Sequence, residues 1–310
     1  MEAIHTAGLT KHYGRTVALD SLDLSVRPGE VYGFLGPNGA GKTTTIRLLL
    51  GLHRPTAGRA RIFGIDAWRD PVRAHRRVAY VAGEPALWPA LTAGETLEFL
   101  AQLHGGTDTA YRATLVARFE LDLRGKVRAL SKGNRQKVQL IAALATRADV
   151  LLLDEPTSGL DPLMEAVFRD CALQAKQRGQ TIFLSSHILS EVEALCDRVG
   201  ILQAGRLIDQ GTLAELRHLR APTVELTFSG SVPDVRCPPG ARVVGTAGNV
   251  LRLEVTGNPA AAIAAYADCP VTGVVSREPT LEEIFLRHYS GTGPSVVTRP
   301  ERERQPSRGG

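Results

Sequence analysis

The sequence predicts an α/β fold built around a parallel sheet, with a helical subdomain, followed by a small C-terminal α+β domain. Two wholly apolar runs, residues 150–153 and 181–184, have the form of central strands covered on both faces. Between them, residues 161–179 have the pattern of a crossover helix that ends at a glycine, which completes a βαβ unit. The third observation is a glycine-rich octapeptide directly after the strand-like run 31–35.

This octapeptide, residues 36–43, reads Gly-Pro-Asn-Gly-Ala-Gly-Lys-Thr and fits the pattern GxxxxGK[ST]. A strand-like run precedes it and a helical stretch follows it, as a phosphate-binding loop requires. Backbone N–H groups of such a loop close around a polyphosphate because glycine leaves the approach open. A turn without a ligand would not need the lysine and threonine, so the fold class is a P-loop NTPase nucleotide-binding domain. The loop residues expected to bind nucleotide are Gly36, Pro37, Asn38, Gly39, Ala40, Gly41, Lys42, Thr43 and Thr44.

Four of the side chains around this loop have expected chemical roles. Lys42 is expected to reach the β- and γ-phosphates, and Thr43 to bind Mg²⁺ through its hydroxyl. Asp154 and Glu155 end an apolar strand at the edge where parallel sheets bind ligands. Asp154 would anchor the Mg²⁺, and Glu155 would orient and deprotonate the attacking water. An acid pair at a strand end is often only structural, but the phosphate loop favours a metal and water site.

The domain organisation follows from changes in pattern along the chain. Residues 1–220 form the nucleotide-binding domain, within which the helical periodicity from about 84 to 144 predicts a helical insert. After about residue 220, prolines interrupt alternating strand-like runs, so residues 221–290 are expected to form the α+β accessory domain. Residues 291–310, rich in Gly, Pro, Ser, Arg and Glu, predict a disordered tail.

Composition excludes several classes of function. The formal net charge is +5, and four arginines and two glutamates in the last twenty residues carry +2 of it, which leaves too little to favour nucleic-acid binding. The four cysteines show no CxxC pairing, so neither a zinc site nor a disulfide framework is indicated. No apolar run reaches the ~20 residues that span a bilayer, and no secretory signal is present, so we expect a cytoplasmic protein.

The heptad at residues 130–136, Leu-Ser-Lys-Gly-Asn-Arg-Gln, precedes a helical run, and with it the set of motifs resembles the ATP-binding cassette (ABC) family. The family signature is Leu-Ser-Gly-Gly-Gln, whereas this chain has Lys132 for the first glycine and Asn134 for the glutamine. Ser131, Gly133 and the helix remain, so an anion at the helix N-terminus is still favoured, and Lys132 adds positive charge. Taken alone, a plain serine N-cap accounts for the heptad equally well.

Three further residues resemble family landmarks. The resemblance implies that His187 contacts the γ-phosphate and holds the catalytic water, and that Asp161, in Ser-Gly-Leu-Asp, acts across a dimer interface. Tyr13 resembles the aromatic residue that stacks on adenine, although a surface tyrosine is the competing interpretation. Where the family usually has a glutamine that senses Mg²⁺, this chain has Gly83. Glu84 is the candidate replacement ligand, because carboxylate oxygen suits a hard cation.

The resemblance covers about residues 1–220, and the ending 279–286 resembles exporter-type subunits of the multidrug and antibiotic-efflux branch. It implies an ATPase that uses ATP and Mg²⁺, works as a homodimer or heterodimer, and powers export of a drug, antibiotic or lipid-like substrate through separate transmembrane subunits. In such a dimer the signature Ser131 acts on the nucleotide of the other copy. The alternatives are a soluble ATPase acting on nucleic acid or the ribosome, and an importer subunit.

The membrane partner implies a peripheral location on the inner face of the cell membrane. Trp88, Pro89 and Leu91, early in the helical insert, are candidates for docking this partner. A core patch of the insert is the alternative interpretation of these apolar residues.

Overall fold

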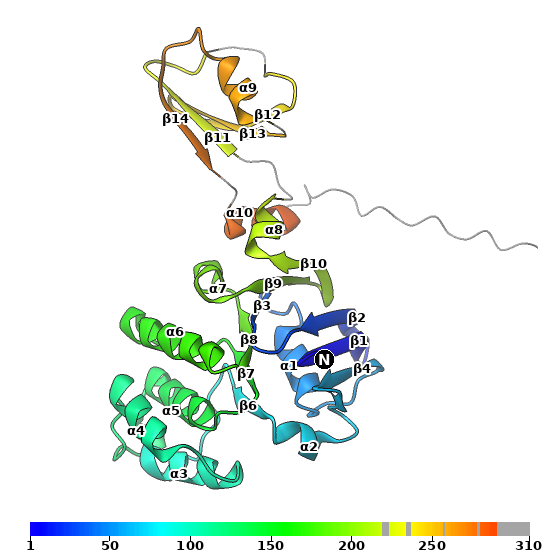
Figure 1. The fold of residues 1–310 in the computed structure, drawn as a ribbon, viewed down its shortest axis with the longest axis vertical. Helices are drawn as coiled ribbons and strands as arrows, with labels where there is room; N and C mark the ends of the chain where they lie inside the picture. The colour runs from blue at the N-terminus through cyan, green and yellow to red at the C-terminus, as the bar shows by residue number, and fades with distance from the viewer. Residues whose placement is uncertain (219–222, 234–236, 257, 278–279, 290–310) are drawn as a thin grey trace, which may run out of the picture. The chain divides into compact units, whose positions relative to one another are not determined.

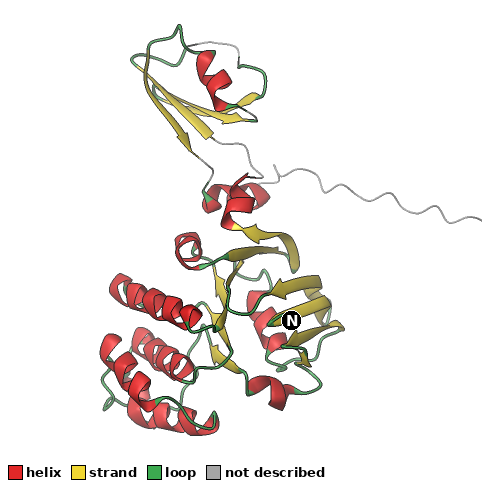
Figure 2. Ribbon diagram, in the orientation of Figure 1, coloured by secondary structure: helices red, strands yellow, loops and turns green. Residues whose placement is uncertain are grey.

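The computed structural model describes residues 1–218, 223–233, 237–256, 258–277 and 280–289, and the predicted disordered tail at 291–310 lies outside the described residues. The chain divides into two compact units, Met1–Leu219 and Arg220–Gly310. Each unit contains both strands and helices (Figure 2).

A six-stranded, mostly parallel sheet forms the centre of the first unit (Figure 1). In spatial order its strands are β10 (Arg206–Thr212), β9 (Arg198–Gln203), β3 (Val31–Leu35), β8 (Thr181–Ser186), β7 (Val150–Asp154) and β6 (Val78–Val81). Only β10 runs antiparallel to its neighbour. Every residue of β3, β7 and β8 is buried, as their wholly apolar runs predicted. The predicted α/β fold class is therefore confirmed.

A second, antiparallel sheet lies beside the central one, with α1 between them (Figure 1). Its strands, in spatial order, are β2 (Thr16–Val26), β1 (Ile4–Tyr13), β4 (Ala57–Ile62) and β5 (Ile65–Asp66). Helix α1 (Lys42–Leu49) buries Ile46 and Leu49 in a core that also contains Ile4 from β1 and Phe183 from β8. This packing fixes the N-terminus of α1 next to the ends of the parallel strands.

The other face of the central sheet is covered by helices, with further helices beyond them (Figure 1). These helices are α5 (Lys132–Ala145), α6 (Pro162–Gln177) and α7 (Leu189–Leu195), while α3 (Ala93–Leu103) and α4 (Thr109–Arg118) pack on α5. Side-chain caps fix several starts: Thr92 and Glu95 form a capping box on α3, and Asp161 caps α6 ahead of a proline. The remaining elements of this unit are α2 (Pro71–His75), the 3₁₀ turn η1 (Val127–Ala129) and α8 (Leu213–His218).

The second unit is a small α+β structure. Its antiparallel sheet has the strand order β12 (Ala241–Ala247), β13 (Val250–Val255), β11 (Thr223–Phe228) and β14 (Val271–Arg277). Helix α9 (Pro259–Ala264) contacts β11, and α10 (Leu281–Tyr289) ends the described chain. Alternate residues of β11 and β13 point into a core in which the rings of Phe228 and Tyr266 meet edge-on, with their centroids 6.2 Å apart.

Among the described residues, no helix combines the length and the apolar character that a bilayer crossing demands. All four cysteines are free thiols, and Cys171 and Cys196 are buried. Burial raises the pKa of the Cys171 thiol to about 11, so it stays protonated at neutral pH.

Candidate nucleotide-binding site

The glycine-rich loop connects β3 to α1 and depends on its glycines. Gly39 and Gly41 have φ values of 81° and 114°, which favour glycine over residues with a side chain. A Cβ on Gly41 would lie 2.6 Å from the Ala18 carbonyl oxygen, and one on Gly36 would lie 2.6 Å from the Leu202 carbonyl oxygen. Backbone atoms cannot yield to such contacts, so the loop conformation needs glycine at these positions.

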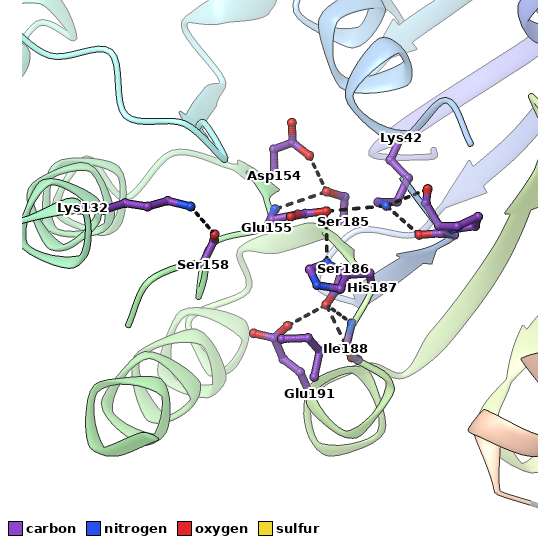
Figure 3. Close-up of polar contacts among 12 residues, drawn as sticks. Lys42, Lys132, Asp154, Glu155, Ser158, Ser185, Ser186, His187, Ile188 and Glu191 are labelled. Carbon is purple, nitrogen blue, oxygen red and sulfur yellow. Dashed lines mark hydrogen bonds and ion pairs between the residues drawn. The ribbon is translucent and has the colours of Figure 1, made fainter. Parts of the chain in front are cut away.

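Lys42 lies at the centre of this loop with only 5% of its surface exposed. Its Nζ donates hydrogen bonds to the carbonyl oxygens of Gly36 (2.6 Å) and Pro37 (3.2 Å), and lies 3.6 Å from Glu155 Oε1 (Figure 3). Burial lowers the pKa of Lys42, and the nearby carboxylates of Glu155 and Asp154 partly oppose this shift. A polyphosphate bound here would supply negative charge beside a buried ammonium group.

Two neighbouring cavities adjoin the loop. The smaller, of about 170 Å³, is lined by Ala18, Pro37, Asn38, Gly39, Gly41, Lys42, Thr43, Thr44 and Glu155. The larger, of about 370 Å³, is lined by Asn38, Thr43, Arg47, Tyr80, Ala82, Gly83, Glu84, Lys132, Asp154, Glu155 and Ser158. Lining groups of the larger cavity include the Thr43 hydroxyl and three carboxylates, and hydroxyl and carboxylate oxygens suit a hard cation. In the described chain, no three His, Cys, Asp or Glu residues lie close enough together to form a metal site by themselves.

The two acids at the end of β7 are held by the neighbouring strand β8. Ser185 Oγ donates to Asp154 Oδ1 at 2.5 Å, and the Glu155 backbone N–H donates to the Ser185 carbonyl oxygen at 3.0 Å. Glu155 has a φ of 46°, which is uncommon for a residue with a side chain. Its Oε1 lies 3.2 Å from His187 Nδ1 (Figure 3). The structure thus brings Lys42, Glu155 and His187 together.

A buried carboxyl group supports the turn that carries His187. Ser186 Oγ accepts from the Ile188 backbone N–H (2.9 Å) and donates to Glu191 Oε2 on α7 (2.7 Å) (Figure 3). Burial raises the pKa of Glu191, and the Ser186 and Thr157 hydroxyls partly oppose the rise. Glu191 Oε1 is fully buried and has no hydrogen-bond partner among the described residues. Sequence reasoning missed Ser185, Ser186 and Glu191; the available signal was a glutamate four residues after His187.

The signature residues lie apart from the phosphate loop of their own chain. Ser131 caps α5 by accepting from the Asn134 backbone N–H at 3.2 Å, and Asp161 caps α6 by accepting from the Met164 N–H at 3.0 Å. Lys132 Nζ donates to Ser158 Oγ at 2.8 Å. The structure describes all four predicted signature residues and Asp161. Among these five, Lys132 lines the larger cavity, whereas Ser131, Gly133, Asn134 and Asp161 line neither cavity.

Two further predicted residues have different surroundings. The Tyr13 ring is exposed, with the His53 ring edge-on at 5.7 Å and Lys11 Nζ 4.9 Å from its centroid, and it lines neither cavity. Glu84 is exposed and lines the larger cavity beside Asp154. A Cβ on Gly83 would lie 3.2 Å from the Asp154 carbonyl oxygen, so this position is tightly packed against β7.

A phosphate loop, an acid pair at the end of the adjacent parallel strand, and a histidine beside the second acid define a P-loop nucleoside triphosphatase. The chain belongs to the ABC transporter family, whose profile matches residues 19–158. It is 38% identical to the bacitracin transport ATP-binding protein BcrA of Bacillus licheniformis, over 73% of this chain and 75% of that protein. It is 36% identical to the daunorubicin resistance ATP-binding protein DrrA3 of Streptomyces coeruleorubidus, over 93% of this chain and 96% of that protein.

Two further similar proteins support the same family assignment. The Nod factor export ATP-binding protein I of Ralstonia nicotianae is 34% identical over 90% of this chain and 91% of that protein. A solved ATP-binding subunit of an ABC transporter superposes with a TM-score of 0.66 at 32% identity, covering 70% of this chain and 92% of the other. The predicted exporter-type ATP-binding subunit with ATPase activity is therefore confirmed, and the importer and nucleic-acid alternatives are not favoured.

Proposed function

We propose that this chain hydrolyses ATP with Mg²⁺ as one half of a dimer and thereby drives export through separate transmembrane subunits. The observation that carries the proposal is the convergence of Lys42 and His187 on one oxygen of Glu155, at 3.6 and 3.2 Å. A cation from the phosphate loop and an imidazole from the neighbouring strand thus flank one carboxylate. This is the arrangement needed to bind a γ-phosphate and activate a water beside it.

Each group at this centre has a distinct part in the proposal. Lys42 and the loop N–H groups bind the β- and γ-phosphates, and Thr43 and Asp154 hold Mg²⁺, with Glu84 as a further oxygen ligand. When bound, Mg²⁺ neutralises charge on the phosphates. Glu155 takes the proton of the attacking water, and His187 orients Glu155 and contacts the γ-phosphate.

The dimer is proposed because several predicted nucleotide-binding residues lie away from the phosphate cavities of their own chain. Ser131, Gly133, Asn134 and Asp161 do not line the phosphate cavities of their own chain, yet Ser131 begins α5, where N–H groups favour an anion. A second copy, or a homologous subunit, would present these residues and Lys132 to the γ-phosphate. Tyr13 would stack on adenine.

The proposed membrane partner docks on an apolar groove of about 530 Å³ between the end of α1, helix α2 and helix α3. Leu52, Leu100 and Leu103 line it, and Leu103 is 64% exposed. Trp88 lines an adjoining cavity and packs edge-on against Phe99 at 4.7 Å, so docking extends to Trp88 and its neighbours Pro89 and Leu91. This association would hold the chain at the inner face of the membrane.

The proposed cargo is a drug, an antibiotic or a lipid-like molecule. The names of the similar proteins, for bacitracin transport, daunorubicin resistance and Nod factor export, support an amphiphilic or antibiotic substrate. The transmembrane subunits would select the cargo, because the polar site described in this chain is made of the nucleotide-binding residues.

The test is Glu155→Gln in the purified full chain, with Glu120→Gln on the exposed surface as the matched control. Glutamine keeps the shape but not the base, so phosphate release should fall roughly 100- to 10,000-fold. Size-exclusion chromatography with ATP should show a stable dimer. A variant that still hydrolyses ATP at the wild-type rate would remove Glu155 as the base. A variant that binds ATP but stays monomeric would argue against the dimer.

A further inference from the structure

A basic groove of about 600 Å³ lies along strand β4, apart from the nucleotide cavities. Its lining includes Arg54, Arg59, Arg61 and Arg69, together with Trp68. Among the lining residues, all of which are described, Asp66 is the single acid. The groove therefore has an excess of positive charge.

This excess is not neutralised by nearby acids. Asp66 Oδ1 accepts hydrogen bonds from the backbone N–H groups of Trp68 (3.1 Å) and Arg69 (3.0 Å). The next acid along the chain, Asp70, caps α2 by accepting from the Arg73 N–H. Within the described residues, none of the four groove arginines has an ion-pair partner. Four guanidinium groups are thus available to an anionic partner.

One exposed aromatic side chain lines the basic groove, and two exposed aliphatic side chains lie close in sequence to its arginines. Trp68 is 41% exposed, and Val72, on the short helix that follows it, is 69% exposed. Leu52, in the turn after α1, is 58% exposed. Aromatic and aliphatic side chains interleaved with arginines suit the interface of a lipid bilayer, where indole rings sit at the level of the headgroups.

The groove also adjoins the surface proposed for the membrane subunit. Helix α2 contributes Val72 and His75 to the apolar groove, and the residues just before it, Trp68 and Arg69, line the basic groove. A partner seated on α2 would therefore bring the basic groove close to the membrane. We propose that the surface formed by Arg54, Arg59, Arg61, Trp68 and Arg69 binds the phosphate headgroups of anionic lipids. The inference rests on the proposed membrane location of the subunit.

Two alternative roles compete for these arginines. They could shield the part of β4 that the short strand β5 does not pair with, because charged side chains at exposed strand edges prevent aggregation. They could also contact an acidic loop of the transmembrane subunit. The exposed indole of Trp68, which lines the basic groove itself, favours lipid, because neither edge protection nor an acidic loop requires it.

The test measures co-sedimentation of the full chain with vesicles of phosphatidylglycerol and phosphatidylcholine in equal parts, and with vesicles of phosphatidylcholine alone. Binding should require the anionic lipid and weaken as salt is raised. Combining Arg54→Gln, Arg59→Gln and Arg69→Gln should lower the affinity roughly 100-fold. The control combines Arg124→Gln, Arg128→Gln and Arg169→Gln, which remove the same charge from exposed positions elsewhere and should retain binding.

Fluorescence gives a second readout at the surface itself. The chain has two tryptophans, so Trp88→Phe leaves Trp68 as the reporter, and its emission should shift to shorter wavelength on anionic vesicles. Equal binding to both kinds of vesicle, equal losses in the two triple variants, or an unshifted Trp68 emission would overturn the proposal. So would a groove variant that aggregates but binds vesicles normally, or one that fails only to assemble with the membrane subunit in detergent. ATP hydrolysis by the same samples without lipid tests the proposed function separately.

Discussion

His187 Nδ1 lies 3.2 Å from Glu155 Oε1, although the two residues follow different strands of the central sheet. The parallel register that pairs Asp154 with Ser185 places the ends of β7 and β8 side by side, and so places the residues that follow them within reach. An imidazole that donates from Nδ1 fixes the rotamer of the carboxylate that would accept the proton from water. The relative position of His187 and Glu155 therefore depends on the sheet rather than on a flexible loop.

Replacing His187 with alanine should lower kcat by roughly 100-fold, because Glu155 loses the group that orients it. The KM for ATP should change much less, since Lys42 and the loop remain intact. His187→Gln, which keeps a donor group, should recover part of the loss. Steady-state ATPase assays on the three proteins check this. If alanine raised KM and left kcat unchanged, His187 would be a binding group only.

Replacing Glu84 with alanine should raise the Mg²⁺ concentration needed for half-maximal ATPase activity. Glu84 is exposed but lines the same cavity as Thr43 and Asp154, so its carboxylate can contribute one oxygen to a hard cation. Asp154→Asn should have a larger effect, because Asp154 is buried and fixed by Ser185. A Mg²⁺ titration of phosphate release measures both. An unchanged profile for Glu84→Ala would exclude it as a ligand.

The elements around the phosphate loop could be predicted from the sequence because the signals are local. Short apolar runs at β3, β7 and β8 correspond to strands with every residue buried, and the glycines of the loop correspond to backbone positions without room for a Cβ. A strand that is buried on both faces consists almost entirely of apolar residues, which is easy to recognise in a sequence. A position with positive φ and a backbone atom close to the Cβ site accepts only glycine, which is equally easy to recognise.

The supporting polar contacts could not be predicted in the same way. Ser185 and Glu191 each act on a residue that a different segment supplies, and the register of β7 against β8 decides those pairings. Periodicity alone does not separate core from surface on α3. Leu97 is buried, but Leu103, at the same helical spacing, is exposed at a groove. A stripe of leucines looks alike whether it faces the core or a partner.

Replacing Gly133 with alanine should destabilise the first unit by about 1–3 kcal/mol, the usual cost of overpacking. A Cβ there would lie 2.4 Å from the Gly159 carbonyl oxygen, so the start of α5 would have to move away from the loop after Glu155. Alanine is otherwise favourable inside a helix, so helix propensity would predict the opposite sign. Urea unfolding measures the change. Gly230→Ala, in the second unit, is the control for a glycine-to-alanine change whose added Cβ would meet nothing within 4 Å. Equal stability of both variants would mean that this contact relaxes without cost.

Replacing Glu191 with glutamine should stabilise the protein relative to wild type, and the gain in stability should grow as pH rises. Burial raises the pKa of Glu191 in the folded state above its value of about 4.3 in an unfolded chain. Between these two values the folded state binds more protons than the unfolded state, so this carboxyl lowers stability as pH increases. Glutamine keeps the acceptor for Ser186 and adds a donor toward Thr157, but it does not titrate.

The difference in Tm between Glu191→Gln and wild type should therefore be near zero at about pH 4 and grow toward neutral pH. Three other titratable groups interact electrostatically with the Glu191 carboxyl. They are Glu165 on α6, His187 in the turn before α7, and Cys196 at the end of α7. Repeating the series in a His187→Gln background removes the imidazole from the comparison. Glu120→Gln, at an exposed position, controls for loss of a carboxyl. A Tm difference that is constant across the range would show that Glu191 is ionised in the folded protein as in the unfolded chain.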